Sequence, residues 1–280
     1  MIAQLGTGLM GAGFARAFLK RGKEVRVWNR TAERAWPLEA EGARVFADVR
    51  EAVAGASEIH LTLKDDASVD EVLGRILESV ERGALILDHT TTAPTPTSHR
   101  YARLEKANVS FAHVPMFMGP KNALESTGLM LVSGPQERYA LVKPAIEPMT
   151  GRLLYVGEGD SRAAAFKLFG NMMLVFIVSG LADIYRFAKS LGITPADAHS
   201  LFETFRPGGA IDLRGKNMAK GDFTAQWELV MARKDVRLMI EEATLHGAQL
   251  SVLPAIAALF DRGIAEGHGN EDVGAVAALD

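Results

Sequence analysis

Residues 1–34 read MIAQLGTGLMGAGFARAFLKRGKEVRVWNRTAER, and this stretch decides the fold. It opens with a short apolar run at residues 2–5, and residues 14–19 then carry the apolar face of a helix. Residues 24–28 have the character of a second strand. A strand, a helix and another strand joined by short connections are typical of a parallel β-α-β unit. The unit predicts that the N-terminal part of the chain is built on a parallel sheet.

Three glycines lie between the first predicted strand and the helix. Gly6, Gly8 and Gly11 form the pattern G-x-G-x-x-G. In such a unit the first glycine allows a tight turn, the second lets a pyrophosphate approach the backbone, and the third lets the helix pack closely on the strand. The N-terminus of the helix then faces the anion. Glycine clusters also occur in ordinary turns, but the strand and helix on either side favour a dinucleotide site.

The residues that select between NAD and NADP are expected at the end of the second strand. An acidic residue there would hydrogen-bond a ribose 2′-hydroxyl, whereas a basic residue would accommodate a 2′-phosphate. This chain has Asn29, Arg30 and Thr31, which offer no carboxylate, and a planar guanidinium is suited to phosphate. Asn29 and Thr31 can also serve as turn and N-cap residues of the next helix, and both interpretations can hold together. We therefore expect NADP rather than NAD.

The composition of the whole chain excludes several classes of protein. At 280 residues, of which 48% are hydrophobic, the chain suits two domains with sizeable cores. A formal net charge of −3 argues against a nucleic-acid partner. The chain has no cysteine, which excludes disulfides and thiolate metal sites, and we expect no metal. No secretory signal is recognisable at the N-terminus, so the expected location is the cytoplasm.

Two regions of different character follow from the hydrophobic pattern. Up to residue 160, strands and helices alternate, which predicts an α/β fold with a doubly wound, mostly parallel (Rossmann) sheet. From residue 161 the patterns are helical, beginning with a long apolar helix at residues 161–191. We predict an NADP-binding domain at 1–160 and an all-helical substrate and oligomerisation domain at 161–280. Further strands are expected at residues 43–46, 57–63, 84–87, 109–114 and 128–132, and further helices at 32–41, 48–54, 66–78, 95–107, 195–204, 227–246 and 252–266.

The longest apolar stretch lies within this long helix, at residues 172–182. It is interrupted by polar residues within a few turns and is shorter than the roughly 20 apolar residues that a membrane span requires. We therefore expect a buried helix and no contact with a membrane.

Several motifs follow the glycine turn in a fixed order. Residues 88–94 read DHTTTAP, residues 113–119 read HVPMFMG, and residues 157–171 contain G-x-G followed by Lys167 and Asn171. Lys234-Asp235 and the tail GHGNEDVGA at residues 267–275 come later. Over essentially the whole chain this order resembles the β-hydroxyacid dehydrogenase family, which contains 3-hydroxyisobutyrate dehydrogenases and semialdehyde reductases and is similar to 6-phosphogluconate dehydrogenase.

Lys167 and Asn171 are the candidate catalytic residues. They are four residues apart, so on a helix they share one face. A lysine can protonate a carbonyl oxygen as hydride reaches the carbon, and an asparagine can fix that oxygen or the lysine. Burial would lower the pKa of Lys167 from its usual value near 10.4. Without the motif context, a lysine extending from a buried helix to solvent would be the better interpretation.

The resemblance implies roles for other residues. Thr91 would contact the nicotinamide or the substrate, although threonines before helices are also common N-caps. Lys234 would close onto the cofactor from the second domain, although alone it would be taken for a solvated helix charge. The candidate cofactor-binding residues are Gly6, Gly8, Leu9, Met10, Gly11, Asn29, Arg30, Thr31, Leu63, Lys64, Thr91 and Lys234. The candidate substrate-binding residues are Thr91, Met116, Phe117, Met118, Gly119, Lys167 and Asn171.

Two departures from the family pattern affect the substrate end. Family members typically have D-A-P-V-S-G-G, in which serine and glycine backbone groups hold a substrate carboxylate, whereas this chain has Phe117 and Met118 at the serine and first glycine positions. The first asparagine of the family's lysine motif is Gly170. Either the substrate is less polar than a short hydroxy acid, which the two large apolar side chains favour, or other donors hold its carboxylate. The candidate donors are Lys121, Asn122, Arg206 and Arg214.

The sequence thus predicts an NADP(H)-dependent oxidoreductase that transfers hydride between the nicotinamide and a small aldehyde or ketone, or the corresponding β-hydroxy acid or alcohol. An imine reductase of the same fold is an alternative, although such enzymes generally replace the catalytic lysine. A non-catalytic module that binds NADP for assembly is another, and it would be indifferent to Lys167→Ala. The long apolar helix predicts a homodimer or homotetramer, because its surface exceeds what one subunit can cover.

Overall fold

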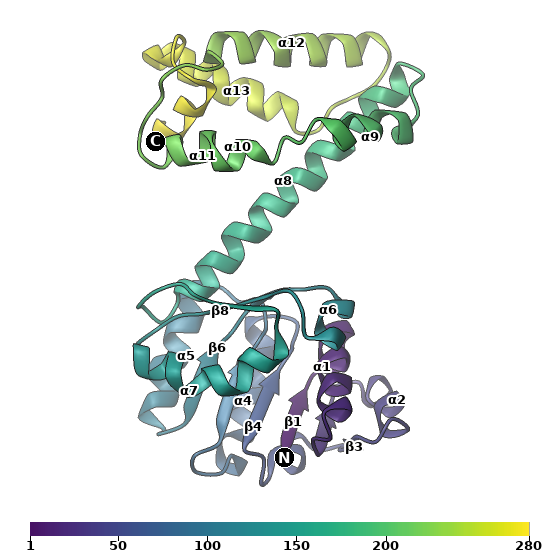
Figure 1. The fold of residues 1–280 in the computed structure, drawn as a ribbon, viewed down its shortest axis with the longest axis vertical. Coiled ribbons are helices and arrows are strands. Elements are labelled where there is room, and N and C mark those ends of the chain that lie inside the picture. The colour runs from purple at the N-terminus through teal and green to yellow at the C-terminus, as the bar shows by residue number, and fades with distance from the viewer. Residues whose placement is uncertain (280) are drawn as a thin grey trace. The chain divides into compact units, whose positions relative to one another are not determined.

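Six parallel strands form the sheet of the N-terminal region (Figure 1). The structure, a computed structural model, describes residues 1–279. The strand order is β3-β2-β1-β4-β5-β6, so the order reverses between β1 and β4. In doubly wound sheets ligands bind at this reversal, beyond the carboxyl ends of the strands. The strands are β1 (Ile2–Leu5), β2 (Val25–Trp28), β3 (Arg44–Val45), β4 (Glu58–Leu61), β5 (Leu85–Asp88) and β6 (Ser110–His113).

Both faces of this sheet are buried. Successive residues of a strand point to opposite sides, so each strand contributes side chains to both faces. On β5, Leu85 and Leu87 belong to one hydrophobic cluster and Ile86 belongs to the other. Helices cover both clusters, which confirms the predicted α/β, doubly wound fold. Those over the first cluster are α1 (Leu9–Lys20), α2 (Trp36–Glu39), α6 (Pro120–Glu125) and α7 (Gln136–Ile146), and those over the second are α3 (Val49–Val53), α4 (Asp66–Ile76) and α5 (Pro94–Lys106).

One predicted helix is divided in the structure. The sequence predicts a single helix over residues 32–41, but a 3₁₀ helix, η1 (Ala32–Arg34), precedes a separate α2. Pro37 lies in the first turn of α2, where its missing N–H leaves no helical bond unmade, and a proline disfavours continuation of an earlier helix. The prediction of one continuous helix was therefore wrong. Two more 3₁₀ helices, η2 (Leu77–Ser79) and η3 (Glu147–Met149), follow α4 and α7.

A second, smaller sheet follows β6. Its order is β7 (Met116–Phe117), β8 (Leu129–Val132) and β9 (Arg152–Tyr155), with β7 antiparallel and β9 parallel to β8. The sequence predicted β8 but assigned it to one large sheet, which was wrong because, within residues 1–279, β8 pairs with β7 and β9 and with no strand of the main sheet. The sequence prediction also lacked β7, β9, α6 and α7. This sheet is important for the site, because β7 carries Phe117.

The chain consists of two compact units, Met1–Met172 and the residues from Met173 onward. The division falls inside the long helix α8 (Arg162–Ser190), which the sequence predicts over residues 161–191. As predicted, the described part of the second unit is helical. Its elements are α9 (Pro195–Thr204), α10 (Gly209–Asp212), α11 (Arg214–Met218), α12 (Leu229–Leu245), α13 (Leu253–Gly263), η4 (Ile264–His268) and η5 (Val273–Ala278).

The middle of α8 is exposed, so the expectation of a buried helix at residues 172–182 was wrong for the single chain. Val175 and Val178 are 61% and 66% exposed. By length and composition α8 could cross a membrane. However, the interval between the charged residues Lys167 and Asp183 rises only roughly 22 Å at 1.5 Å per residue, whereas a hydrocarbon core is ~30 Å thick. The apolar side chains in the middle of α8 are thus exposed in the structure.

Candidate functional site

The glycine turn lies at the carboxyl end of β1, beside the reversal of strand order. Gly6 has a φ of +89°, and a Cβ there would overlap the carbonyl oxygen of Thr62. A Cβ at Gly11 would overlap the carbonyl oxygen of Gly6, so only glycine lets α1 begin this close to the strand. At Gly8, in contrast, no atom of the described chain lies within 4 Å of the Cβ position. The backbone at Gly8 is therefore open to a ligand.

The first turn of α1 presents backbone donors to this open space. Gly8 is the N-cap of α1 and supplies no side-chain cap. The first N–H groups of a helix have no partner within the helix, and the helix dipole favours an anion beside them. Leu9 is 79% exposed and Met10 is half-buried, so neither side chain closes the turn. This uncapped turn fits the diphosphate of a dinucleotide.

Asn29 connects the end of β2 to the glycine turn. Its Oδ1 accepts a hydrogen bond from the backbone N–H of Thr7 at 2.9 Å, and its Nδ2 donates to the carbonyl oxygen of Thr31 at 2.8 Å. A pocket of about 280 Å³ opens beside it. The pocket is lined by Gly6, Gly8, Trp28, Asn29, Arg30, Thr31, Arg34, Thr62, Leu63, Lys64, Ser68, Glu71 and Val72. The structure thus brings together seven of the residues that the sequence assigned to the cofactor.

Arg34 is a residue of this pocket that the sequence reasoning missed. Arg30 and Arg34 are both exposed, and neither has an ion-pair partner among residues 1–279. Arg34 also lines a second pocket, of about 670 Å³, along α1 and α6. Arg16 lines that pocket too, but its guanidinium pairs with Glu41 at 2.6 Å. The available signal was the position of Arg34 four residues after Arg30, in the helix predicted at residues 32–41.

The two helices beside this larger pocket pack without a gap. A Cβ at Gly13 of α1 would lie 2.9 Å from the Cβ of Ala123 on α6. Such a distance is too short for two carbon atoms, so only glycine allows the contact. Helix α6 follows directly after the candidate substrate residues 116–119, and Figure 1 shows it beside α1. The start of the cofactor helix and the end of the substrate loop are therefore neighbours.

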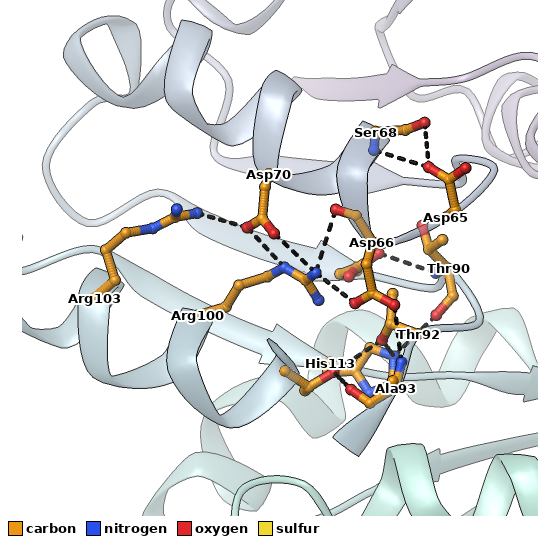
Figure 2. A network of polar contacts seen from close by, with 12 residues as sticks. Asp65, Asp66, Ser68, Asp70, Thr90, Thr92, Ala93, Arg100, Arg103 and His113 are labelled. Atoms are coloured by element: carbon orange, nitrogen blue, oxygen red, sulfur yellow. Dashed lines mark hydrogen bonds and ion pairs between the residues drawn. The ribbon is translucent and has the colours of Figure 1, made fainter. Parts of the chain in front are cut away.

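The loop after β5 holds Thr91 between two anchored threonines. The Oγ1 of Thr90 accepts a hydrogen bond from the backbone N–H of Leu63 at 3.0 Å. The Oγ1 of Thr92 lies 3.0 Å from Nε2 of His113, as Figure 2 shows. Thr90 and Thr92 are buried, whereas Thr91 is exposed. The loop therefore presents the Thr91 side chain to solvent at the carboxyl edge of the sheet.

A buried guanidinium supports the same loop from the other side (Figure 2). Asp66 accepts a hydrogen bond from the backbone N–H of Ala93 at 3.0 Å and a second from Arg100 at 2.5 Å. The side chain of Arg100 is 1% exposed and also contacts Asp70 at 3.0 Å. Its Nε and Nη2 bind the two carboxylates, whereas its buried Nη1 has no hydrogen-bond partner among the described residues. Arg100 therefore fixes α4, α5 and the Thr91 loop to one another and is not a ligand-binding cation.

Lys167 is buried although it is a lysine. It is 8% exposed, and no carboxylate or hydrogen-bond acceptor pairs with its Nζ among residues 1–172. Its Nζ lies 4.1 Å from the centroid of the Phe117 ring. Burial lowers the pKa of Lys167 from 10.5, because the ammonium is partly removed from water. Asn171 is half-buried one turn further along α8, on the same side of the helix.

The candidate substrate residues 116–119, which precede α6, have different roles in the structure. Met116 is buried in the core of the main sheet, and Phe117 packs against the smaller sheet and Ala163. The backbone N–H of Gly119 donates to Oδ1 of Asn122 at 2.9 Å, and Nδ2 of Asn122 donates to Oγ1 of Thr127 at 2.9 Å. The amide of Asn122 is thus used in fixing the start of α6. Of this segment, Phe117 is the residue that the structure brings to Lys167.

Three sequence candidates belong to the second unit. Lys234 lies on α12, with its Nζ 2.8 Å from Oδ1 of Asp235. The Nε of Arg214 donates to Oδ1 of Asp272 at 2.8 Å, so this guanidinium is held inside the unit. Arg206 is exposed. Arg214 is therefore a structural residue, and its guanidinium is not free to donate hydrogen bonds to a substrate carboxylate.

Comparison with known proteins agrees with this architecture. Residues 1–157 match the NAD binding domain of 6-phosphogluconate dehydrogenase. Residues 161–279 match the NAD-binding region of NADP-dependent 3-hydroxyisobutyrate dehydrogenase. Together with the open glycine turn and its pocket, these matches define an NAD(P)-dependent oxidoreductase. The chain belongs to the β-hydroxyacid dehydrogenase family, as the order of its motifs predicted.

The similarity to known proteins extends over nearly the whole chain. A probable 3-hydroxyisobutyrate dehydrogenase of Mycobacterium bovis is 26% identical over 286 residues, which cover 98% of this chain and 96% of the relative. An imine reductase from Myxococcus stipitatus in complex with NADP⁺ has a TM-score of 0.93 at 19% identity, covering 100% and 99% of the two chains. A reductive aminase from Aspergillus terreus in complex with NADPH and ethyl levulinate has a TM-score of 0.88 at 25% identity, covering 98% and 97%. The imine reductase shows the shared fold, which confirms the predicted architecture.

Proposed function

We propose that the protein interconverts a small aldehyde or ketone and the corresponding alcohol or β-hydroxy acid, with Lys167 as general acid in reduction and general base in oxidation. The supporting observation is the buried ammonium of Lys167, which has no carboxylate partner among residues 1–172. Such an ammonium releases its proton more easily than a solvated one. The bound nicotinamide supplies or accepts the hydride. The Nζ of Lys167 donates a proton to the carbonyl oxygen in reduction and removes it in oxidation.

The remaining site residues take positioning roles in this proposal. Asn171 follows Lys167 on the same helix face, where its amide orients the reacting oxygen or the lysine. Thr91 is held at the carboxyl edge of the sheet, where it contacts the nicotinamide or the substrate. Lys234 is a further proposed cofactor-binding residue, and Met118 and Gly119 are proposed to line the substrate site.

The cofactor that we propose is NADP(H) rather than NAD(H). The end of β2 carries Asn29, Arg30 and Thr31 and therefore has no carboxylate for a ribose 2′-hydroxyl. Arg30 and Arg34 face the pocket without ion-pair partners among the described residues, as a 2′-phosphate requires. The M. stipitatus and A. terreus structures contain NADP⁺ and NADPH.

We further infer that the chain acts as a homodimer or homotetramer in the cytoplasm. A second copy of the chain would cover the apolar side chains of α8, whose uncharged interval is too short for a membrane. The domains proposed for this assembly are residues 1–160 for the cofactor and 161–280 for substrate binding and association. The family matches at 1–157 and 161–279 support this division. A monomeric mass in solution would contradict the proposal.

Imine reduction is the second candidate function. It is favoured by the structural similarity to the A. terreus reductive aminase and by the apolar side chains of Phe117 and Met118. The buried ammonium of Lys167 argues against it, because an iminium substrate is a cation and two adjacent cations repel each other. The carbonyl reaction does not bring a second cation to Lys167.

The test is a spectrophotometric screen of NADPH consumption with short aldehydes, semialdehydes, larger ketones and cyclic imines, repeated with NADH. Turnover of a carbonyl compound that is lost in Lys167→Ala supports the proposal. Turnover of a cyclic imine but of no carbonyl compound establishes the second candidate instead. NADPH binding without turnover of any compound supports a non-catalytic role in assembly.

A further inference from the structure

The aromatic ring of Phe117 packs directly against the backbone of α8 at Gly170. Gly170 lies inside α8, and a Cβ at this position would overlap Cζ of Phe117 and lie 2.6 Å from Cε1. The ring can therefore occupy its place only because residue 170 has no side chain. The two departures from the family sequence, one in the substrate loop and one in the lysine helix, are two halves of one contact.

The same ring forms one side of the environment of Lys167. Lys167 and Gly170 are three residues apart on α8, so both face the ring. The Nζ of Lys167 lies 4.1 Å from the ring centroid. A general acid must lie within hydrogen-bond reach of the carbonyl oxygen, so the substituents of the reacting carbon come close to whatever surrounds Nζ. Here that neighbour is an aromatic face.

An aromatic face is a poor neighbour for a carboxylate. It offers no hydrogen-bond donor, and its quadrupole presents negative charge to the anion. A carboxylate removed from water against this surface would receive no hydrogen bond from the ring, which is costly, and it would compete with the carbonyl oxygen for the Lys167 ammonium. The donors nearest in sequence do not supply this hydrogen bond, because the amide of Asn122 is engaged with Gly119 and Thr127. Lys121 lies one residue earlier, is exposed and pairs with Glu125 at 3.9 Å.

We propose that Phe117, packed against Gly170, determines the substrate specificity. It selects carbonyl substrates in which the reacting carbon carries apolar substituents and has no carboxylate nearby. This inference rests on the proposed function and names its substrate class. The ring performs two tasks. It excludes a carboxylate from the surroundings of Nζ, and it provides an apolar surface against which an alkyl or aryl substituent is buried.

The contact between Phe117 and Gly170 is tested by thermal unfolding, which needs no substrate. Gly170→Ala should lower the melting temperature by roughly 3–6 °C, because the new methyl group must displace the Phe117 ring. In the Phe117→Ala background the same change should raise the melting temperature, because alanine is the better helix former. Gly74→Ala on α4, where no atom of the described chain lies within 4 Å of the Cβ position, is the control for that helix-forming gain. An equal effect of Gly170→Ala in both backgrounds would disprove the contact.

The specificity is tested with two aldehydes of matched shape. 4-Methylpentanal has a branched alkyl end at the position where succinic semialdehyde has its carboxylate. The wild type should favour 4-methylpentanal in kcat/KM by about tenfold or more, since tenfold corresponds to about 1.4 kcal/mol of unpaired charge. Phe117→Ser should reduce this ratio about tenfold. Phe117→Leu stays apolar and nearly as large, so it should keep the ratio near that of the wild type. The Kd for NADPH is measured for each variant and should be unchanged.

The outcomes separate the inference from the function on which it rests. A wild type that is active but prefers succinic semialdehyde, or a ratio that Phe117→Ser leaves unchanged, overturns the inference and leaves the proposed function intact. A wild type that consumes NADPH with neither these aldehydes nor any other carbonyl compound overturns the proposed function and the substrate class with it. The unfolding measurements then still decide whether Phe117 and Gly170 are paired.

Discussion

The Oδ1 of Asn29 accepts a hydrogen bond at 2.9 Å from the backbone N–H of Thr7, which lies between the first two glycines of the turn. One side chain at the end of β2 thus holds the glycine turn, where we propose that the diphosphate binds. Asn29 also contacts Thr31 through Nδ2 and lines the adjacent pocket. Asn29 therefore fixes the geometry of the turn and, in the proposed function, also contributes to the choice of cofactor.

Two substitutions of Asn29 should separate these roles. Asn29→Leu removes the acceptor for Thr7, so the Kd values for NADPH and NADH should rise together, by roughly 5–10-fold for the loss of one hydrogen bond. Asn29→Asp keeps an acceptor but adds a negative charge, so it should weaken NADPH more than NADH. Fluorescence titration with both cofactors measures the two ratios. An equal loss of both cofactors in Asn29→Asp would contradict this assignment.

The two arginines beside this pocket should determine the preference for a 2′-phosphate. Arg30→Ala and Arg34→Ala should each raise the Kd for NADPH by roughly tenfold, because a charge-assisted hydrogen bond is lost, and should leave NADH binding nearly unchanged. Arg82→Ala is the control, because Arg82 is exposed and lines neither pocket. Titration at two salt concentrations provides a second test, since the NADPH contact should weaken with salt.

The pH dependence of turnover should follow Lys167. Burial lowers the pKa of Lys167 from 10.5, and reduction needs the protonated form. The rate of reduction should therefore fall as the pH rises through a value below 10.5, while the rate of oxidation rises over the same range. Lys167→Ala should lower kcat by roughly 10²–10⁴-fold with little change in the Kd for NADPH. Lys189→Ala, an exposed lysine on the same helix, should leave both unchanged.

Arg100 should contribute strongly to the stability of the first unit. Its side chain is 1% exposed and pairs with Asp66 and Asp70 (Figure 2). Arg100→Leu leaves both carboxylates without their buried partner and should lower the free energy of unfolding by about 3 kcal/mol. Arg103→Ala removes a 46% exposed partner of Asp70 and should cost less than about 1 kcal/mol. Urea unfolding of the two variants measures the difference, and equal losses would contradict a dominant role for Arg100.

The second unit should lose stability in acid through Asp272. Burial alone would raise the pKa of its carboxyl, but hydrogen bonds from Arg214 and from the backbone of Gly274, Gln226 and Trp227 hold the pKa at about 2. A pKa lowered by folding stabilises the protein above the unfolded value of 3.8, and this contribution disappears as the pH falls toward 2.

The difference in unfolding free energy between wild type and Asp272→Asn should accordingly be about 2 kcal/mol at pH 6 and should shrink between about pH 5 and pH 2. Asp212→Asn is the control, because the side chain of Asp212 is 84% exposed. A difference that stays constant with pH would show that the charge of Asp272 does not stabilise the fold.

Local signals predicted the parts of the fold that depend on neighbouring residues. Helix α9 begins at Pro195 and ends at Thr204 as predicted, because Thr194 accepts a hydrogen bond from the backbone N–H of Asp197 and proline favours the first turn. The glycine turn was predicted for the same reason, since each glycine satisfies a requirement within one β-α-β unit. The pocket at Asn29 followed from its position after β2.

Features that depend on distant contacts were not predictable in this way. Strand β7 has two residues, which carry no periodicity, and its pairing with β8 depends on the chain folding back. The fit between Phe117 and Gly170 requires two segments far apart in the sequence to meet. The exposure of α8 was misjudged, because an apolar sequence does not show whether its own chain or another covers it.

The contact of Gly13 with Ala123 has a consequence for how the site responds to its ligands. No side chain fits between α1 and α6, so one helix cannot shift without displacing the other. The first turn of α1 is the proposed diphosphate site, and the residue before α6 is Gly119, two positions after Phe117. A displacement of α1 would therefore be conveyed to α6 and to the loop before it through the contact of these helices, and a methyl group added at Gly13 would disturb both segments at once.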